Sequence, residues 1–183
     1  MNSLERVTKA IEFKTPDRIP LAGHAEGDIV GVPGDANWIV RTPVKDPETG
    51  EVKNKKWYFD ENAGEWRRRD IYGCIHRSAD RSLPGYEVIN HPCENLDDIE
   101  AFEPPDPDTI HPFLDKFLSS AGSLPDDKYL LSSIDPGPFL VVINLMGYEN
   151  MLTAMVTHPD KVASLYRKVS DYKLELITRI KDK

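Results

Sequence analysis

The chain has 183 residues, a formal net charge of −8 and 39% hydrophobic residues. This length suits one domain or a piece of a larger one, and it is ample for a hydrophobic core. The net negative charge argues against nonspecific binding to nucleic acid or to an anionic membrane, because the field of the chain repels phosphate. No apolar run is long enough to span a membrane, the N-terminus does not resemble a signal peptide, and only two cysteines occur. We therefore expect a cytoplasmic protein without a disulfide framework.

The N-terminal residues predict a helix followed by a strand. Apolar residues fall there at helical spacing, at Leu4, Val7, Ala10 and Ile11. Asn2 or Ser3 is expected to cap this helix, and Glu5 would complete a capping box. Residues 18–23 then predict a short strand. The stretch 24–35, rich in glycine and polar residues, is expected to form a loop or short helix at the tip of that strand.

The middle of the chain predicts β-structure. Two runs typical of strands, residues 38–44 and 52–59, flank the turn sequence DPETG. We interpret residues 38–66 as a β-hairpin insertion at the rim of the domain. Residues 66–75 predict a further strand, and residues 86–90 predict another that could pair beside it.

Residues 128–150 predict a strand, a turn and a helix in succession. The apolar run 129–134 has the length of a buried strand and ends at Asp135. Residues 136–138 (PGP) break the chain, and a second apolar run, 139–146, is expected to be the helix. In parallel α/β proteins the polar groups that do chemistry lie at such strand tips, which makes Asp135 a candidate.

Helical spacing also predicts the remaining elements. Asn95 is expected to cap a short helix over 96–102, and residues 113–118 predict a helix before the strand at 129. A helix is expected after Gly147, and Pro159 is well placed in the first turn of the last helix. The apolar face of that helix comprises Val162, Leu165, Tyr166, Val169, Tyr172, Leu176, Ile177 and Ile180.

Several segments together resemble the uroporphyrinogen decarboxylase (URO-D) family, which includes the haem-pathway decarboxylase and cobalamin-dependent methyltransferases. The order and spacing of the segments carry the resemblance. These segments are Glu5-Arg6-Val7 with Pro16 to Leu21, Asp70-Ile71 with Gly73, Gly85-Tyr86 with His91-Pro92 and Asn95 to Ile99, and Gly137 to Leu140 with Asn144-Leu145 and Gly147. The family folds as a (β/α)8 barrel of about twice this length. The resemblance therefore implies an α/β fold, the N-terminal part of a TIM-type barrel with about three βα units, in which residues 1–183 form one partial domain.

Departures from the family pattern favour the methyltransferase-like branch. The decarboxylase has an R-Q-A-G-R motif after its first strand that holds substrate carboxylates. Here residues 21–28 (LAGHAEGD) stand in its place, and the acids Glu26 and Asp28 replace bases. They would repel a porphyrinogen that carries many carboxylates. Asn144 stands where the decarboxylase has a tyrosine, whereas Asp70 matches the carboxylate that accepts hydrogen bonds from pyrrole N–H groups.

The resemblance implies methyl transfer between a corrinoid and a thiol or other acceptor in a complete protein. In that branch a His-x-Cys pair and a later cysteine in the C-terminal half hold zinc, and this chain resembles only the N-terminal half. His91-Pro92-Cys93 spells His-x-Cys, but it lies in another segment and has no third ligand at suitable spacing. We therefore expect no zinc or corrinoid to be bound by this portion alone, and the chain alone to be inactive.

Two alternatives stay open. One is porphyrinogen decarboxylation, as in porphyrin biosynthesis, with Asp70 stabilising the cation of a protonated pyrrole. The other is a non-catalytic module that binds a corrinoid or a partner chain. The expected partners are a small-molecule substrate or a corrinoid protein, with no nucleic acid and no membrane, and self-association into a homodimer is left open.

The candidate site residues follow from these considerations. Asp70 is the candidate catalytic residue, and His24, Asp28, Asp135 and Asn144 are the candidate substrate-binding residues. Each also has a structural interpretation. Asp70 could pair with the arginine run before it, and His24 could bond a backbone carbonyl of its loop. Asp135 could cap a helix, and Asn144 could serve packing.

Overall fold

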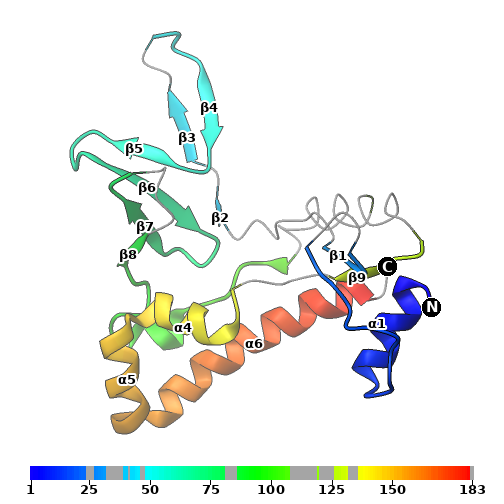
Figure 1. Ribbon diagram of the computed structural model, residues 1–183. Helices are drawn as coiled ribbons and strands as arrows, with labels where there is room; N and C mark the ends of the chain where they lie inside the picture. The colour runs from blue at the N-terminus through cyan, green and yellow to red at the C-terminus, as the bar shows by residue number, and fades with distance from the viewer. Residues whose placement is uncertain are drawn as a thin grey trace. The chain divides into compact units, whose positions relative to one another are not determined.

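The computed structural model shows a mixed α/β protein with small sheets (Figure 1). The residues described are 1–23, 27–31, 39–40, 42–45, 48–80, 86–107, 119, 126–131 and 136–181. The chain divides into two compact units. Unit 1 comprises residues 1–36, 108–135 and 179–183, and unit 2 comprises residues 37–107 and 136–178.

Unit 1 contains a helix and a two-stranded parallel sheet. Helix α1 (Ser3–Ile11) starts as predicted, because the side chain of Asn2 accepts a hydrogen bond of 2.8 Å from the backbone N–H of Glu5. Strand β1 (Ile29–Gly31) pairs in parallel with β9 (Tyr129–Leu131), with Ile29 opposite Tyr129. The predicted strand at 129–134 is thus confirmed over residues 129–131.

The predicted strand over residues 18–23 is wrong. Only Ala22 makes a single bridge, to Ile29, and the strand itself lies at 29–31, inside the stretch expected to be a loop. The reason is local. Pro20 has no N–H to donate, and the N–H of Leu21 bonds the side chain of Asp28 at 3.0 Å instead of a neighbouring strand.

Unit 2 contains an antiparallel sheet of five strands and a separate hairpin. The sheet runs in the order β2-β6-β7-β8, and β5 also pairs with β6. The hairpin of β3 and β4 confirms the one predicted around DPETG. The bounds are β2 (Ile39–Val40), β3 (Thr42–Lys45), β4 (Val52–Lys55), β5 (Tyr58–Asp60), β6 (Glu65–Asp70), β7 (Ile75–Ser78) and β8 (Glu87–Asn90).

Two boundaries in this region differ from the prediction. The segment 38–66 is not separate from the sheet, because β2 and β5 both pair with β6. Residues 66–75 are not one strand, because β6 ends at Asp70 and β7 starts at Ile75. Between them Gly73 adopts φ +91°, a backbone conformation that favours glycine and turns the chain. The predicted strand at 86–90 is confirmed as β8, which pairs with β7.

Four helices with defined bounds complete unit 2: α2 (Asp98–Ala101), α4 (Pro138–Met146), α5 (Tyr148–Thr157) and α6 (Pro159–Lys181). Pro159 begins α6, as predicted. Asp97, not Asn95, occupies the N-cap of α2. The core gathers between these helices and includes Ile99, Val141, Val142, Leu145, Met146, Met151, Leu165 and Val169, each at most 1% exposed. The predicted helix over 113–118 lies outside the described residues.

Helices α4 and α5 meet at Gly147 at an angle of 100°. Gly147 adopts φ +79°, and the ring of His91 lies 3.4 Å from the place that a Cβ atom would take. The positive φ favours glycine at this position, whereas a Cβ atom would make an ordinary contact with the His91 ring. Within the described part of the chain no single helix is long and apolar enough to cross a membrane, although α4 and α5 together pass that test as a bent pair.

Candidate functional site

A buried polar cluster lies on one face of the sheet in unit 2. Successive side chains of a strand alternate between faces, so Arg68 and Asp70 of β6 share a face. The register places His76 of β7 opposite Arg68, which brings His76 to the same face. Arg68 is 7% exposed, Asp70 1% and His76 0%. Three ionisable side chains are therefore gathered where an antiparallel sheet normally buries apolar ones.

Asp70 uses both of its carboxylate oxygens inside this cluster. Oδ1 accepts hydrogen bonds from the backbone N–H groups of Tyr72 at 3.0 Å and Cys74 at 2.9 Å. Oδ2 lies 2.9 Å from Nε2 of His76. The carboxylate thus ties the turn between β6 and β7 together and orients the imidazole ring. An aspartate that orients a histidine is an arrangement suited to proton transfer, and it equally locks a buried turn.

Arg68 is held between two aromatic rings. Its guanidinium carbon lies 4.6 Å from the ring centroid of Trp57 and 4.2 Å from that of Tyr86. Tyr86 also packs edge-on against His76, with a centroid distance of 5.2 Å. Burial lowers the pKa of Arg68, whereas Tyr86, through its charge and a side-chain hydrogen bond, and then Asp70 act in the opposite direction. The two ring faces contribute to the stabilisation of the cation, and Tyr86, at 46% exposed, brings this stack to the surface.

Two cysteines and a histidine bind the C-terminal end of α4. Cys74 Sγ and His91 Nδ1 both bond the backbone oxygen of Asn144, at 3.3 and 2.7 Å. The backbone N–H of Cys93 donates to the backbone oxygen of Leu145 at 2.8 Å. These contacts satisfy carbonyl groups that a helix end leaves without a partner in the helix. Asn144, a predicted substrate-binding residue, is 8% exposed in this packed region.

The thiols of this region are poor metal ligands at neutral pH. Burial raises the pKa of Cys93 to about 11 and raises that of Cys74 further above its ordinary value. A thiol must lose its proton to bind zinc, and burial disfavours that loss for both groups. His91, the first residue of the His-x-Cys sequence, already bonds Asn144. In the part of the chain that the structure describes, no three His, Cys, Asp or Glu side chains could hold a metal ion together.

A second buried carboxylate, Asp28, lies in unit 1. It is 0% exposed and bonds Arg6, Arg18 and the backbone N–H of Leu21. Burial would raise the pKa of Asp28, but the Leu21 N–H and the two guanidinium groups outweigh it and hold the pKa well below its usual range. Arg6 also bonds Asp17 and lowers the pKa of Asp17 to about 2.

This arrangement changes the electrostatic interpretation of residue 28. The sequence suggests an acidic side chain that repels an anionic substrate. In the structure the charge of Asp28 is balanced by two arginines, of which Arg18 keeps 45% of its side chain exposed. Residue 28 therefore presents no uncompensated negative charge to a ligand.

The predicted site residues are thus distributed over several places. Asp70 and Asn144 belong to unit 2 and Asp28 belongs to unit 1. His24 and Asp135 lie outside the described residues. The resemblance implies that Asp70, His24 and Asp28 contribute to one pocket wall, and this grouping stays a prediction.

Sequence reasoning missed the residues that surround the two aspartates. In unit 2 these are Trp57, His76 and Tyr86, and in unit 1 they are Arg6 and Arg18, whereas Arg68 belongs to the arginine run already considered as a partner of Asp70. The sequence does contain a signal for the position of His76. A turn at Tyr72-Gly73 would have placed His76 beside Arg68 through the alternation of strand side chains.

Comparisons with known proteins add no further assignment. No family model, no curated protein and no solved structure matches the chain.

Proposed function

We propose that the chain is the N-terminal part of a URO-D-type (β/α)8 barrel enzyme of the corrinoid methyltransferase branch. The observation that carries the proposal is the parallel pairing of β1 with β9, two strands far apart in the sequence. Parallel neighbours cannot be joined by a hairpin and need a long crossover connection. A barrel of the proposed type is built entirely from such pairs.

Helix α1 supports the same proposal from within unit 1. The backbone N–H of Leu4 donates to the backbone oxygen of Asp127, immediately before β9, at 3.3 Å. Lys128 Nζ in turn donates to the backbone oxygen of Gly27, immediately before β1, at 2.8 Å. The start of the helix and the starts of both strands are therefore bound to one another, as in a barrel whose N-terminal helix abuts the first strands.

The bonding of Asp70 favours the methyltransferase branch over porphyrinogen decarboxylation. A decarboxylase of this family needs a carboxylate that accepts hydrogen bonds from pyrrole N–H groups. Asp70 already accepts two backbone hydrogen bonds and contacts His76. Asp70 is also only 1% exposed, which leaves little of its carboxylate within reach of a substrate. In this proposal Asp70 positions the turn between β6 and β7 and the His76 ring. The negative charge of Asp28 is balanced by Arg6 and Arg18, so it no longer distinguishes the methyltransferase branch from the decarboxylase.

The described residues do not fit a zinc site, because the two thiols have raised pKa values and no three suitable ligands come together. In the proposed protein zinc belongs to the other half of the fold, where it would activate a thiol acceptor. The contribution of this chain is the wall of a corrinoid pocket. No chemical step is assigned to its own residues.

The test combines the 183-residue chain with a second chain that supplies the C-terminal half of a methyltransferase of the family. Corrinoid binding is measured by equilibrium dialysis against methylcobalamin and followed by absorbance. We expect saturable binding, and methyl transfer to a small thiol in the presence of zinc, by the two chains together, and neither by the 183-residue chain alone. His24→Ala should weaken binding by the two chains without changing the melting temperature of the 183-residue chain. Decarboxylation of uroporphyrinogen would contradict the proposal, and so would the absence of any corrinoid binding by the two chains together.

A non-catalytic corrinoid-binding module predicts instead that the 183-residue chain binds methylcobalamin by itself. Saturable binding by the isolated chain, without turnover when the second chain is added, supports the module. Binding and methyl transfer that occur only with the second chain support the enzyme.

A further inference from the structure

Strand β9 has an open edge in unit 1. The backbone N–H of Tyr129 donates to the backbone oxygen of Asp28 at 3.0 Å, on the side of β1. Successive residues of a strand direct their N–H and C=O groups to opposite sides, so those of Leu130 point away from β1. Among the residues that the structure describes, β1 is the one strand that pairs with β9, whereas the far edge of β1 is bridged by Ala22. An edge of this kind is bonded along its length by another extended backbone.

The side chains of β9 are apolar on both faces of the sheet. Leu130 is 40% exposed and Leu131 is 53% exposed. Successive side chains of a strand point to opposite faces, so each face of β9 carries an exposed leucine. Apolar side chains on both faces are typical of an inner strand of a parallel sheet, which other elements cover on both sides. Strand β9 thus has the composition of an inner strand at an open edge.

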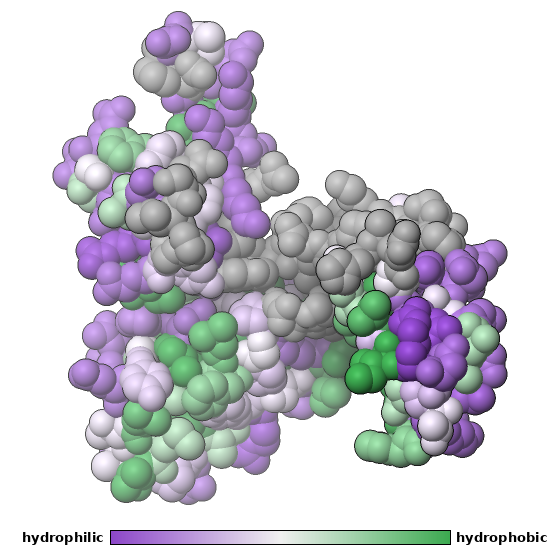
Figure 2. All heavy atoms as spheres, viewed as in Figure 1, coloured by the Kyte–Doolittle hydropathy of each residue, from purple (hydrophilic) through white to green (hydrophobic). Residues whose placement is uncertain are grey.

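An apolar groove of about 420 Å³ adjoins β9 on the face of Leu131. It lies between α1 and the sheet, and its walls include Ile11 of α1, Ile29 of β1, and Tyr129 and Leu131 of β9. None of the described residues that line it carries a charge. Figure 2 shows apolar side chains at the surface beside α1. A chain that binds at this edge of the sheet can therefore bury apolar side chains as well as form backbone hydrogen bonds.

We propose that the complementary half of the barrel adds a parallel strand to the open edge of β9. The inference rests on the proposed function, and it names the place where the second chain used in the test of corrinoid binding attaches. Every strand of a closed barrel has two parallel neighbours. A pair of strands alone is marginally stable in water and gains from a third. Apolar side chains beside the added strand then cover Leu130 and Leu131 and remove them from water.

Amide hydrogen exchange of the 183-residue chain, measured by NMR with and without the second chain, tests this pairing at single residues. The Leu130 N–H should exchange at least about tenfold more slowly when the second chain is present, because it gains a hydrogen-bond acceptor. The Tyr129 N–H already bonds Asp28, so its exchange should change less. An exchange rate at Leu130 that does not change on addition of the second chain would contradict the pairing.

Leu130→Pro removes the N–H that the added strand needs. Proline is tolerated in an edge strand where its nitrogen faces solvent, so the free chain should keep its fold, which circular dichroism checks. The dissociation constant of the two chains, measured by isothermal titration calorimetry, should rise at least about tenfold, because the proline ring lies on the side where the strand must bond. Leu130→Ala keeps the N–H and should raise the dissociation constant less.

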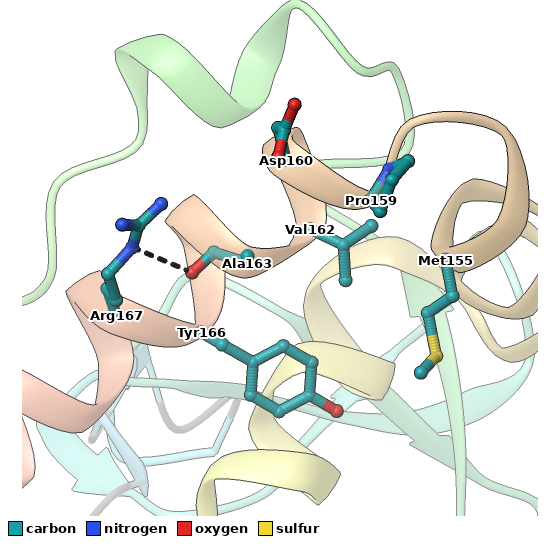
Figure 3. Close-up of a pocket in the computed structure, with 7 residues that line it drawn as sticks. All are labelled: Met155, Pro159, Asp160, Val162, Ala163, Tyr166 and Arg167. Atoms are coloured by element: carbon teal, nitrogen blue, oxygen red, sulfur yellow. Dashed lines mark hydrogen bonds between the residues drawn. The ribbon is translucent and has the colours of Figure 1, made fainter.

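Leu131→Asp tests the apolar cover and leaves the backbone edge unaltered. A carboxylate that apolar side chains must cover should raise the dissociation constant at least about tenfold. Met155→Asp is the matched control. Met155 is 45% exposed and lines a groove of about 600 Å³ between α5 and α6 in unit 2, outside the proposed pairing (Figure 3). Its substitution should leave the dissociation constant unchanged.

The outcomes separate the strand pairing from the proposed function. If the chains associate and the Leu130 N–H is protected while no corrinoid binds, the pairing stands and the proposed function fails. If corrinoid binds while Leu130→Pro and Leu131→Asp associate like the wild type, the proposed function stands and the pairing is overturned. Two chains that do not associate at all would also overturn the pairing.

Discussion

The two buried aspartates, Asp28 of unit 1 and Asp70 of unit 2, are stabilised in different ways. Asp28 is surrounded by charge, with Arg6 and Arg18 on its two oxygens. Asp70 is bonded by two backbone N–H groups and by His76. The nearest arginine of its strand face, Arg68, packs against aromatic rings. The comparison shows that a buried carboxylate can serve either an ion-pair network or the geometry of a turn.

The largest effect is expected from Asp70→Ala. The substitution removes the acceptor of the Tyr72 and Cys74 N–H groups and the contact of His76, all in a buried place. Buried donors without partners should lower the free energy of unfolding by about 3 kcal/mol or more. Urea denaturation measures this loss. Asp70→Asn, which retains one acceptor oxygen, is the control, and equal losses in the two variants would show that the turn does not depend on these bonds.

A smaller loss is expected from Asp28→Asn. The asparagine oxygen can still accept from the Leu21 N–H, but two guanidinium groups lose their counter-charge. The melting temperature should fall, and it should fall more at low ionic strength than at high, because salt screens unpaired charges. The same change applied to Asp70 should show little dependence on salt. A salt dependence of equal size for both would remove the distinction between the two aspartates.

Arg68→Met should be milder still. The substitution removes two cation–π contacts and keeps an apolar chain between the rings of Trp57 and Tyr86. We expect a decrease of about 1 kcal/mol in the free energy of unfolding, because the desolvation of a buried cation is removed at the same time. A decrease as large as that of Asp70→Ala would show that Arg68 acts as an ion-pair partner, as Arg6 does.

The smallest effect concerns pH. Arg6 lowers the pKa of Asp17 from 3.8 to about 2, and Asp17 keeps 42% of its side chain exposed. A lowered pKa in the folded state adds stability that is present above pH 3.8 and is lost as the pH falls through about 2. Asp17→Asn should therefore melt below the wild type at pH 6, and the difference should shrink as the pH falls toward 2 and vanish below it. A difference that is as large at pH 2 as at pH 6 would contradict the assigned cause.

Local patterns predicted much of the secondary structure. Asn2 and Glu5 predicted the start of α1, and Pro159 predicted the start of α6. The turn sequence DPETG predicted the β3–β4 hairpin. Each of these signals lies in a few consecutive residues and acts through local hydrogen bonds or backbone geometry. Such signals need no knowledge of the tertiary fold.

The surroundings of the candidate site could not be predicted in the same way. Arg6 and Arg18 reach Asp28 across 22 and 10 residues of sequence, and nothing in the local pattern pairs them. The strand at 29–31 was missed because its partner, β9, lies in a distant segment. The contacts of Lys168 could not be predicted for the same reason. It bonds the carbonyl oxygens of Ile99, Glu100 and Phe102 at the end of α2, which are distant in sequence.

The parallel pairing of β1 with β9 is the observation on which the proposed fold and function depend. Backbone nuclear Overhauser effects in the isotope-labelled chain measure it directly. The account predicts cross-peaks between residues 29–31 and 129–131 in parallel register, with Val30 opposite Leu130. An antiparallel pattern, or no cross-peaks between these segments, would contradict the account and remove the basis for a barrel of the URO-D type.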